Sequence, residues 1–254
     1  MTLDYEQIPA HDGSTLPKET SVYRYLSAMA FMDLLATKSL GFSKISSWDD
    51  AQEGTRFDAM KLRPDHPYSD KDLGDFYASC WTLQTEDRSI FGSDGDAYQR
   101  SVNELKKFGS DAMWRAYCSG GGVRIETSLA KLEALFCDAD LRIKKLYSGR
   151  VYYDSDESNW SMTPKHHPVS AFLQKRVCFR SEAEFRFLFC FENRTDVAPI
   201  KVPIRILSSL IDEILVSPAK PTSPWNSQVL LKVAKGNAPE CRISQLYGRI
   251  SEGN

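Results

Sequence analysis

The sequence predicts an α+β fold in which a mixed, mostly antiparallel sheet forms the core and helices flank it. Segments with the apolar pattern of strands outnumber segments with the 3.6-residue spacing of helices. They do not alternate regularly as strand, helix and strand, and neither a glycine-rich phosphate loop nor an internal repeat occurs. These observations favour an α+β sheet over a doubly wound one.

The first half of the chain opens with a strand, a helix and a second strand. Its predicted elements are a strand at 22–26, a helix around 29–35, strands at 40–44 and 76–83, and a helix after Ser110 that carries Met113, Trp114 and Tyr117. The glycines at 120–122 end that helix in a turn, because glycine adopts a positive φ at little cost.

The second half continues with short elements between polar loops. We expect a strand at 123–127, a helix at 129–136, a strand at 143–154 bent near Gly149, a helix at 169–177, strands at 184–192, 200–206 and 211–216, a helix at 227–235 and a last strand at 241–246. The loop before Pro168 contains His166 and His167 without a Glu-x-x-His partner, so it does not predict a metal site.

The domain organisation follows from where turn-forming residues gather. Residues 1–20 are polar and interrupted by Pro9, Gly13 and Pro17, which is typical of a leader that is disordered or draped over the fold. After residue 20 no linker rich in proline, glycine or serine divides the chain. We therefore expect one globular domain at 21–254.

Composition narrows the function classes. Lys and Arg number 32 and Asp and Glu 34, so the net charge is 32 − 34 = −2, which predicts no non-specific grip on nucleic acid. Six scattered cysteines without a Cys-x-x-Cys pair indicate a reducing compartment. The sequence shows neither an export signal nor an apolar run long enough for a membrane span. We expect a cytoplasmic protein.

Two segments far apart in the sequence carry the candidate chemistry. Arg24 stands in a strand between Tyr23 and Tyr25, and a buried or cleft-lining arginine needs an anion, either a structural carboxylate or a ligand phosphate. Ser43 ends the next strand, where serine is also common simply as a turn residue.

The second segment is Glu182-Ala183-Glu184, which enters the strand at 184–192. Residues i and i+2 of a strand point to one face, so we expect Glu182, Glu184 and then Arg186 to share a face. The alternative is an exposed edge with two solvated glutamates.

Arginine, then serine at the end of the following strand, then Glu-x-Glu on a late strand resembles the ADP-ribosyltransferases of the Arg-Ser-Glu type. The resemblance implies NAD as the cofactor, with Arg24 on its phosphates, Ser43 at the nicotinamide ribose, Glu184 on the ribose 2′-hydroxyl and Glu182 orienting an acceptor. Tyr25, Trp114 and Tyr117 complete the cofactor-binding candidates, with core packing as the alternative for the last two. It further implies a toxin or phage-defence effector, with a macromolecular acceptor and an antitoxin or regulatory protein as partners.

The chain also resembles the bacterial domain-of-unknown-function family 2971 over nearly its whole length. The matching residues are Tyr23-Arg24-Tyr25, Phe42-Ser43, Trp48-x-Asp50-x-x-Glu53-Gly54, Ser79-Cys80-Trp81-Thr82, Asp111-x-Met113-Trp114-x-x-Tyr117, Gly122-Val123, Glu182-x-Glu184-x-Arg186 and Val216-Ser217-Pro218. The chain departs from that pattern at Asp50-Ala51-Gln52-Glu53, where an Asp-Pro-Phe-Glu-like run is expected. The family implies no settled activity.

Two other functions remain open from the sequence. In the first, carboxylates hold a divalent metal for phosphodiester cleavage and Lys44 or Arg186 stabilises charge; the carboxylates are Asp49, Asp50, Glu53, Glu182 and Glu184. In the second, the chain is a non-catalytic module that binds a nucleotide or a partner. Cys80 lies between apolar strand residues without a neighbouring base, which favours a buried thiol over a nucleophile.

Overall fold

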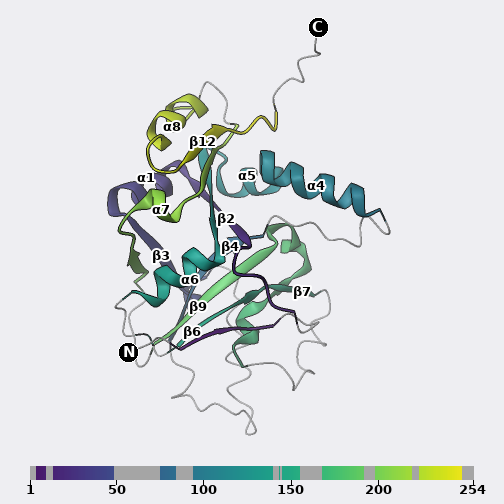
Figure 1. Cartoon of the computed structure of the whole chain (residues 1–254), viewed down its shortest axis with the longest axis vertical. Coiled ribbons are helices and arrows are strands. Elements are labelled where there is room, and N and C mark those ends of the chain that lie inside the picture. Colours follow the sequence, from purple (N-terminus) through teal and green to yellow (C-terminus); the bar gives the residue numbers. More distant parts are fainter. Residues whose placement is uncertain are drawn as a thin grey trace. The chain divides into compact units, whose positions relative to one another are not determined.

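A computed structural model describes residues 4–9, 14–48, 75–83, 94–139, 143, 145–154, 168–191, 198–218 and 223–247 (Figure 1). The fold is α+β, as predicted, with mixed and largely antiparallel strands. The chain divides into two compact units. Unit 1 contains Met1–Thr20, Ser39–Trp81 and Glu133–Pro203, and unit 2 contains Ser21–Lys38, Thr82–Leu132 and Ile204–Asn254.

The strands of unit 1 form a sheet in the order β1, β6, β9, β4, β3, β10. These are β1 (Tyr5–Gln7), β6 (Lys145–Arg150), β9 (Glu184–Phe191), β4 (Asp75–Thr82, of which Thr82 belongs to unit 2), β3 (Ser39–Lys44) and β10 (Ile200–Pro203). The β1–β6 pair is parallel, whereas β6–β9, β3–β4 and β3–β10 are antiparallel. A separate parallel pair joins β7 (Tyr152–Asp154) to β8 (Gln174–Arg176).

The N-terminal segment differs from the predicted leader because part of it joins this sheet. Tyr5–Gln7 pair with Leu146–Ser148, and the backbone N–H of Ile8 donates to the carbonyl of Ser148 at 2.7 Å. Ile8 is buried. Its side chain therefore anchors a segment whose polar composition predicted a place outside the sheet.

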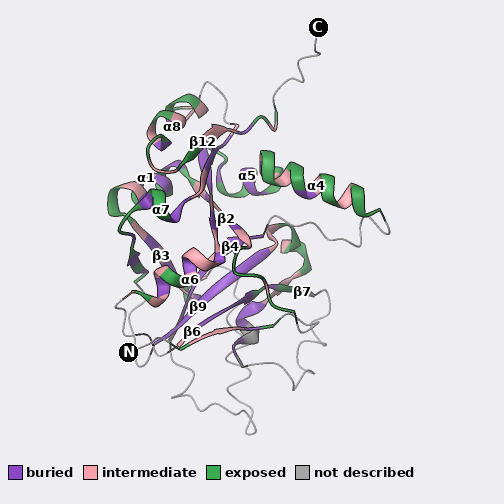
Figure 2. Cartoon of the chain, viewed as in Figure 1, coloured by how far each residue is buried: buried purple, intermediate pink, exposed green. Residues whose placement is uncertain are grey.

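Strand β9 separates its side chains cleanly between its two faces. Its four phenylalanines, Phe185, Phe187, Phe189 and Phe191, alternate with Glu184, Arg186, Leu188 and Cys190. The phenylalanine face packs edge-on against Phe136 of α6 (Leu129–Cys137), with ring centroids 5.0 Å from Phe187 and 5.4 Å from Phe189. All residues of β9 are buried (Figure 2).

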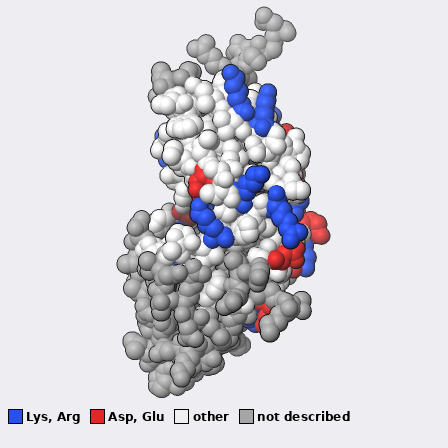
Figure 3. Space-filling view, turned by 90° about the vertical axis from the view of Figure 1, so that its left-hand side faces the viewer, with Lys and Arg blue, Asp and Glu red and all other residues white. Residues whose placement is uncertain are grey.

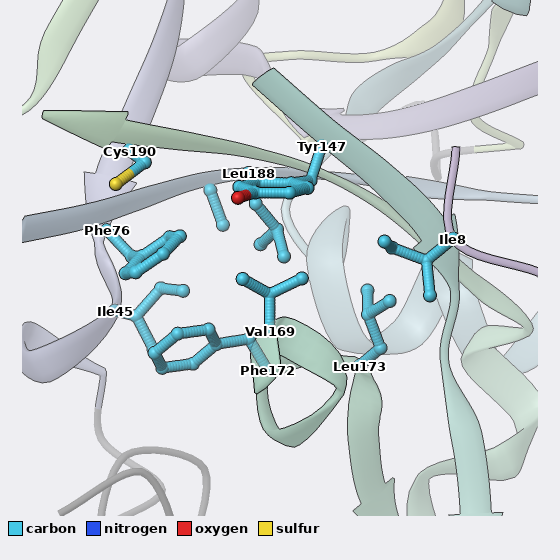
Figure 4. Packing of buried hydrophobic residues seen from close by; sticks show 10 residues of the cluster. Ile8, Ile45, Phe76, Tyr147, Val169, Phe172, Leu173, Leu188 and Cys190 are labelled. Carbon is cyan, nitrogen blue, oxygen red and sulfur yellow. The ribbon is translucent and has the colours of Figure 1, made fainter. Parts of the chain in front are cut away.

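The opposite face of β9 contributes to an apolar cluster that includes residues of two 3-10 turns, η1 (Ile45–Ser47) and η4 (Pro168–Leu173). A third 3-10 turn, η5 (Val177–Glu182), precedes β9 in the chain. Figure 4 shows Val169 of η4 pointing toward Leu188 and Tyr147, with the Phe172 ring near Phe76 and Leu173 near Ile8. The rings of Phe76 and Phe172 lie 4.7 Å apart. We call this cluster the η4 cluster. It lies beside Glu184 and Arg186, the polar residues on the same face of β9.

Unit 2 contains strands that neighbour one another in the order β2, β5, β11, β12. Its strands are β2 (Ser21–Ser27), β5 (Gly122–Ser128), β11 (Glu213–Val216) and β12 (Glu240–Ile243), and its helices are α1 (Ala28–Thr37), α4 (Gly95–Phe108), α5 (Asp111–Tyr117), α7 (Leu207–Leu210), α8 (Ser227–Ala234) and the first part of α6, up to Leu132. The β2–β5 and β5–β11 pairs are antiparallel and β11–β12 is parallel.

Two predicted elements change character in the structure, and α4 appears without having been predicted. The segment expected as a helix at 169–177 is a 3-10 turn followed by β8. The strand expected at 200–206 ends at Pro203, and α7 follows it. Helix α4 has Asp94 as its N-cap, whose side chain accepts from the N–H of Ala97 at 2.8 Å, but Val102 is its one buried residue. An apolar stripe that thin gives little periodic signal.

Within the described ranges, no helix combines the length and apolar character needed to span a membrane. On the face shown in Figure 3, the Lys and Arg side chains of the described residues are spread over the surface, and some of them lie beside Asp or Glu.

Candidate functional site

The centre of the candidate site is a buried ion pair at the start of β9. Nη2 of Arg186 donates to Oε2 of Glu184 at 2.7 Å, and Nη1 donates to the carbonyl of Phe172 at 2.7 Å. The guanidinium lies over the ring of Trp48, 4.6 Å from its centroid. Because residues i and i+2 of a strand share a face, the predicted common face of Glu184 and Arg186 is confirmed.

Lys175 joins a second carboxylate to this pair. Its Nζ lies 2.7 Å from Oε2 of Glu182 and 3.5 Å from Oε2 of Glu184. The ammonium also lies over the ring of Phe179, 4.7 Å from the centroid. The parallel pairing of β8 with β7, in which Lys175 is opposite Tyr153, holds this lysine in place.

Glu182 reaches the cluster from outside the strand, which corrects the expectation that both glutamates share a strand face. It is the last residue of η5, and Ala183 after it has φ 42° and ψ 53°. That left-handed conformation is unfavourable for a residue with a Cβ. The turn at Ala183 gives Glu182 a different approach from Glu184, and the two carboxylates meet at the Lys175 ammonium.

The electrostatics of the cluster keep Glu184 ionised. Burial by itself raises the pKa of the Glu184 carboxyl, but the charge and hydrogen bond of Arg186, then Lys175 and a hydrogen bond with Cys80, bring it below its ordinary value. Tyr153 behaves oppositely, because burial and the nearby Glu184 charge raise the pKa of its phenol. The neutral phenol oxygen accepts from the backbone N–H of Glu184 at 2.8 Å.

Ser43, the third predicted catalytic residue, connects to the same cluster through Trp48. The indole Nε1 of Trp48 donates to Oγ of Ser43 at 2.8 Å. The Trp48 ring also carries the Arg186 guanidinium. A continuous set of contacts thus runs from Ser43 through Trp48, Arg186, Glu184 and Lys175 to Glu182, all within unit 1.

The predicted cofactor-binding residues all belong to unit 2. Arg24 is half-buried in β2 and pairs with Ile125 of β5. Tyr25 and Trp114 are buried with their rings 4.8 Å apart in a T-shaped contact, and Tyr117 at the end of α5 is exposed. The predicted set is therefore divided, with Ser43, Glu182 and Glu184 in unit 1 and the other four residues in unit 2.

Tyr25 and Trp114 use their polar atoms inside the protein. The Tyr25 hydroxyl accepts from the backbone N–H of Ser110 at 2.8 Å, and Nε1 of Trp114 donates to the carbonyl of Phe108 at 3.0 Å. Together with Met113, Cys118 and Leu215 they form an apolar cluster. These contacts agree with the alternative in which Trp114 packs in the core. Stacking of Trp114 on a ligand would require these contacts to break.

The remaining candidates from the sequence are a triple glycine, a cysteine, three acidic residues and a histidine pair. Gly121 has φ 109°, and a Cβ there would lie 2.3 Å from the carbonyl oxygen of Trp225, so the triple glycine is a closely packed turn. Cys80 is half-buried, packs against the η4 cluster and hydrogen-bonds Glu184. The acidic residues Asp49, Asp50 and Glu53, and the pair His166-His167, lie outside the described residues.

Unit 2 contains a second buried polar cluster that the sequence analysis missed. The fully buried Arg124 donates to the carbonyl of Leu105 at 3.0 Å and lies over the Tyr23 ring, 4.6 Å from its centroid. Glu213 lies 3.6 Å from Arg124 and 2.8 Å from Arg242. The hydrogen bond to Leu105 ties α4 to the sheet.

Lys175, Tyr153 and Trp48 are the members of the unit 1 cluster that sequence reasoning did not select as site residues. Lys175 and Tyr153 meet through a pairing between two three-residue strands, which leaves no local sequence signal. The sequence analysis includes Trp48 only in the motif Trp48-x-Asp50-x-x-Glu53-Gly54. Among the residues that the structure describes, no group of three or more His, Cys, Asp or Glu side chains has the arrangement of a metal site.

The chain matches no protein-family model, no curated protein and no solved structure. Its resemblance to family 2971 and to ADP-ribosyltransferases therefore stays a prediction from the residues quoted above.

Proposed function

We propose that the chain is an ADP-ribosyltransferase-like enzyme that uses NAD, breaks the bond between nicotinamide and ribose, and passes ADP-ribose to a macromolecule or to water. The observation that carries the proposal is the contact set from Ser43 to Glu182. Ser43 and the pair Glu182 and Glu184, which are far apart in the sequence, belong to one connected cluster within unit 1.

The charges of the cluster suit this reaction. Departure of nicotinamide leaves positive charge on the ribose, which a fixed carboxylate about 3 Å away stabilises electrostatically. Glu184 carries its negative charge at neutral pH because Arg186 and Lys175 outweigh the effect of its burial. Glu182 adds a second carboxylate beside the same ammonium.

The residues present also have the chemistry that NAD needs. Carboxylates and a serine hydroxyl suit a ribose, an arginine suits the phosphates, and an exposed aromatic ring suits a base. Glu182 and Ser43 of unit 1 are groups of the first kind, and the sequence predicts Arg24 and Tyr117 for the other two. NAD would bring a good leaving group, while the chain's own residues would bind the dinucleotide and hold negative charge at the reacting carbon.

The biological setting is part of the same proposal. Transfer of ADP-ribose to a protein or nucleic acid in the cytoplasm is the chemistry of a toxin or phage-defence effector, and such an enzyme needs an antitoxin or regulatory protein that restrains it. A macromolecular acceptor follows from the proposed transfer, and its identity is an outcome of labelling with NAD that carries a tagged adenine.

The deciding experiment measures nicotinamide release from NAD by the purified chain, with and without bacterial lysate. The test variants are Glu182→Gln and Ser43→Ala, and the matched control is Glu104→Gln on the exposed side of α4. We expect release by the unmodified chain and the control, and loss of release in the test variants. A folded chain that releases no nicotinamide under either condition contradicts the proposal.

A chelator separates the proposal from metal-dependent phosphodiester cleavage. The proposed reaction uses NAD and the chain's own carboxylates, so it needs no divalent cation. We expect nicotinamide release to continue in EDTA. Nucleic-acid cleavage that EDTA abolishes would favour the metal-dependent enzyme.

One observation favours a non-catalytic binding module as the second candidate. The Glu184–Arg186 pair is buried and its two groups contact each other within the chain, as in a purely structural ion pair. In that case a bacterium that expresses Glu182→Gln shows the same growth as one that expresses the unmodified chain, while Arg24→Ala abolishes any growth effect.

A further inference from the structure

The first strand of the chain, β1, is a short edge strand. Among the described strands it lies at one end of the sheet order, next to β6. The pairing covers three residues, Tyr5–Gln7, and a backbone hydrogen bond of 2.7 Å from the N–H of Ile8 to the carbonyl of Ser148 extends it. An edge strand paired over so short a length can separate from its sheet while the rest of the fold stays closed. We call the segment 4–8 the strap.

Ion pairs at the surface hold the first part of the strap on β6. Nζ of Lys145 lies 2.6 Å from Oε2 of Glu6 and 3.4 Å from Oδ2 of Asp4. Asp4 is exposed, and Lys145 and Glu6 are half-buried. Water and dissolved salt weaken ion pairs of this kind. These contacts therefore depend on solution conditions, unlike those of a buried core.

The last residue of the strap, Ile8, reaches the interior. It is buried and belongs to the η4 cluster together with Leu173. Both side chains lie against Gly149 of β6, where an added Cβ would lie 2.5 Å from Cδ1 of Leu173 and 3.4 Å from Cβ of Ile8. Figure 4 shows Ile8 near Leu173. The absence of a side chain at Gly149 thus lets the strap and η4 meet on β6.

The turn η4 in turn holds the buried ion pair of the candidate site. Phe172, which precedes Leu173, accepts at its carbonyl from Nη1 of Arg186 at 2.7 Å. Gly149 is also the Cα partner of Arg186 in the β6–β9 pairing. The strap therefore meets η4 one residue along the chain from the carbonyl that holds Arg186, and one strand across the sheet from Arg186 itself. Arg186 then donates to Glu184 at 2.7 Å.

We propose that the strap is a conformational switch for the candidate site. When the strap is docked on β6, Ile8 holds η4 in place and the Arg186–Glu184 pair is closed. When the strap is released, η4 loosens and the pair opens to solvent. The inference goes beyond the proposed function and does not depend on it, because all of these contacts are within unit 1 and none involves NAD.

Hydrogen exchange of the full chain, followed by mass spectrometry, tests the coupling. Ile8→Ala weakens the anchor of the strap, and Ile206→Ala is the matched control, since Ile206 is 61% exposed in unit 2. We expect β6 and η4 to exchange at least about tenfold faster in Ile8→Ala, because loss of buried methyl groups favours the open state. Exchange in β5 of unit 2 should stay unchanged, and the control should match the unmodified chain in all three elements.

Thiol labelling reports on the ion pair itself. Cys80 packs against the η4 cluster and hydrogen-bonds Glu184, whereas Cys118 is buried in unit 2. Iodoacetamide should label Cys80 several-fold faster in Ile8→Ala than in the unmodified chain or in Ile206→Ala. The labelling rate of Cys118 should be the same in all three proteins.

Two further variants decide the question if Ile8→Ala does not fold. Lys145→Gln removes the surface ion pairs and leaves Ile8 in place, so β6 and η4 should exchange about two- to fivefold faster. The double variant Gln7→Cys and Ser148→Cys joins two Cα partners of the β1–β6 pairing by a disulfide. Exchange in η4 should be slower in its oxidised form than in its reduced form.

Faster exchange in β6 with unchanged exchange in η4 and unchanged labelling of Cys80 would overturn the proposal, because the strap would then open without moving η4. An equal acceleration in β5 would also overturn it, since the whole chain would then be destabilised. In the disulfide variant, equal exchange of η4 in the oxidised and reduced forms would have the same meaning.

Discussion

Replacement of Arg186 by methionine measures most directly how much the buried ion pair of unit 1 contributes to stability. Arg186 is 1% exposed and gives two hydrogen bonds of 2.7 Å, to Glu184 and to the carbonyl of Phe172. Methionine fills similar space but leaves Glu184 buried beside a lysine 3.5 Å away. Removal of one partner from a buried ion pair costs about 3–5 kcal/mol, against a total stability of about 5–15 kcal/mol for a typical domain.

The pH dependence of that loss identifies its cause. In the unmodified chain the pKa of Glu184 is below its ordinary value of 4.5, so its contribution to stability is present above that pH and is lost as pH falls through the lowered pKa. In Arg186→Met, burial is no longer opposed by the charge and hydrogen bond of Arg186, so the pKa of the Glu184 carboxyl rises from its lowered position. The variant therefore loses stability relative to the unmodified chain increasingly as pH rises and Glu184 ionises.

We therefore expect the stability difference between Arg186→Met and the unmodified chain to be largest near pH 7 and to shrink near pH 4.5. Urea denaturation followed by tryptophan fluorescence measures it, and Trp48 reports from beside the replaced side chain. Arg115→Met is the matched control, because Arg115 forms an exposed pair with Asp111 on α5 and its loss should change little. A difference that is equal at both pH values would refute the electrostatic account and leave packing as the cause.

Three further predictions concern unit 2. Gly121→Ala should lower the free energy of unfolding in urea by at least about 1–2 kcal/mol, because φ is 109° and the new Cβ meets a backbone oxygen at 2.3 Å. The control, Gly95→Ala on α4, has open space around it and should be neutral or stabilising by about 0.4–1 kcal/mol. Tyr25→Phe should cost about 1–3 kcal/mol in the same assay, because it leaves the N–H of Ser110 without its acceptor; an unchanged midpoint would contradict this. Burial raises the pKa of Cys118 to about 12, so iodoacetamide at pH 7.5 should label the exposed Cys178 and spare Cys118, as judged by mass spectrometry of the folded chain.

Strand β9 shows what the sequence could predict. Four phenylalanines alternate with Glu184, Arg186, Leu188 and Cys190, and a period of two fixes which side chains share a face. The strand and the proximity of Glu184 to Arg186 followed directly from that pattern. Helix α1 was predictable for a similar reason, since the apolar spacing that predicted a helix around 29–35 falls within the observed Ala28–Thr37.

Pairing between distant segments explains what the sequence could not predict. Lys175 belongs to a stretch with a helix-like apolar pattern, yet its side chain reaches Glu182 because three residues of β8 pair with β7 more than twenty residues earlier. The turn at Ala183 was equally hidden, because alanine disfavours the left-handed conformation that it adopts there. Both features are set by tertiary contacts, which override local preference.

The division of the predicted site between the two units bears on how its parts should be tested. Order along the chain placed Arg24 and Ser43 close together and Glu184 far away, but Ser43 shares unit 1 with Glu184 while Arg24 belongs to unit 2. The predicted roles of Glu182 and Arg24 differ, so their replacement should affect different kinetic constants. Glu182→Gln should lower kcat, whereas Arg24→Ala should raise KM for NAD, since lost ground-state binding appears in KM. An Arg24→Ala variant that lowers kcat and leaves KM unchanged would show that Arg24 acts on the transition state, and the prediction that Arg24 binds the phosphates would have to be abandoned.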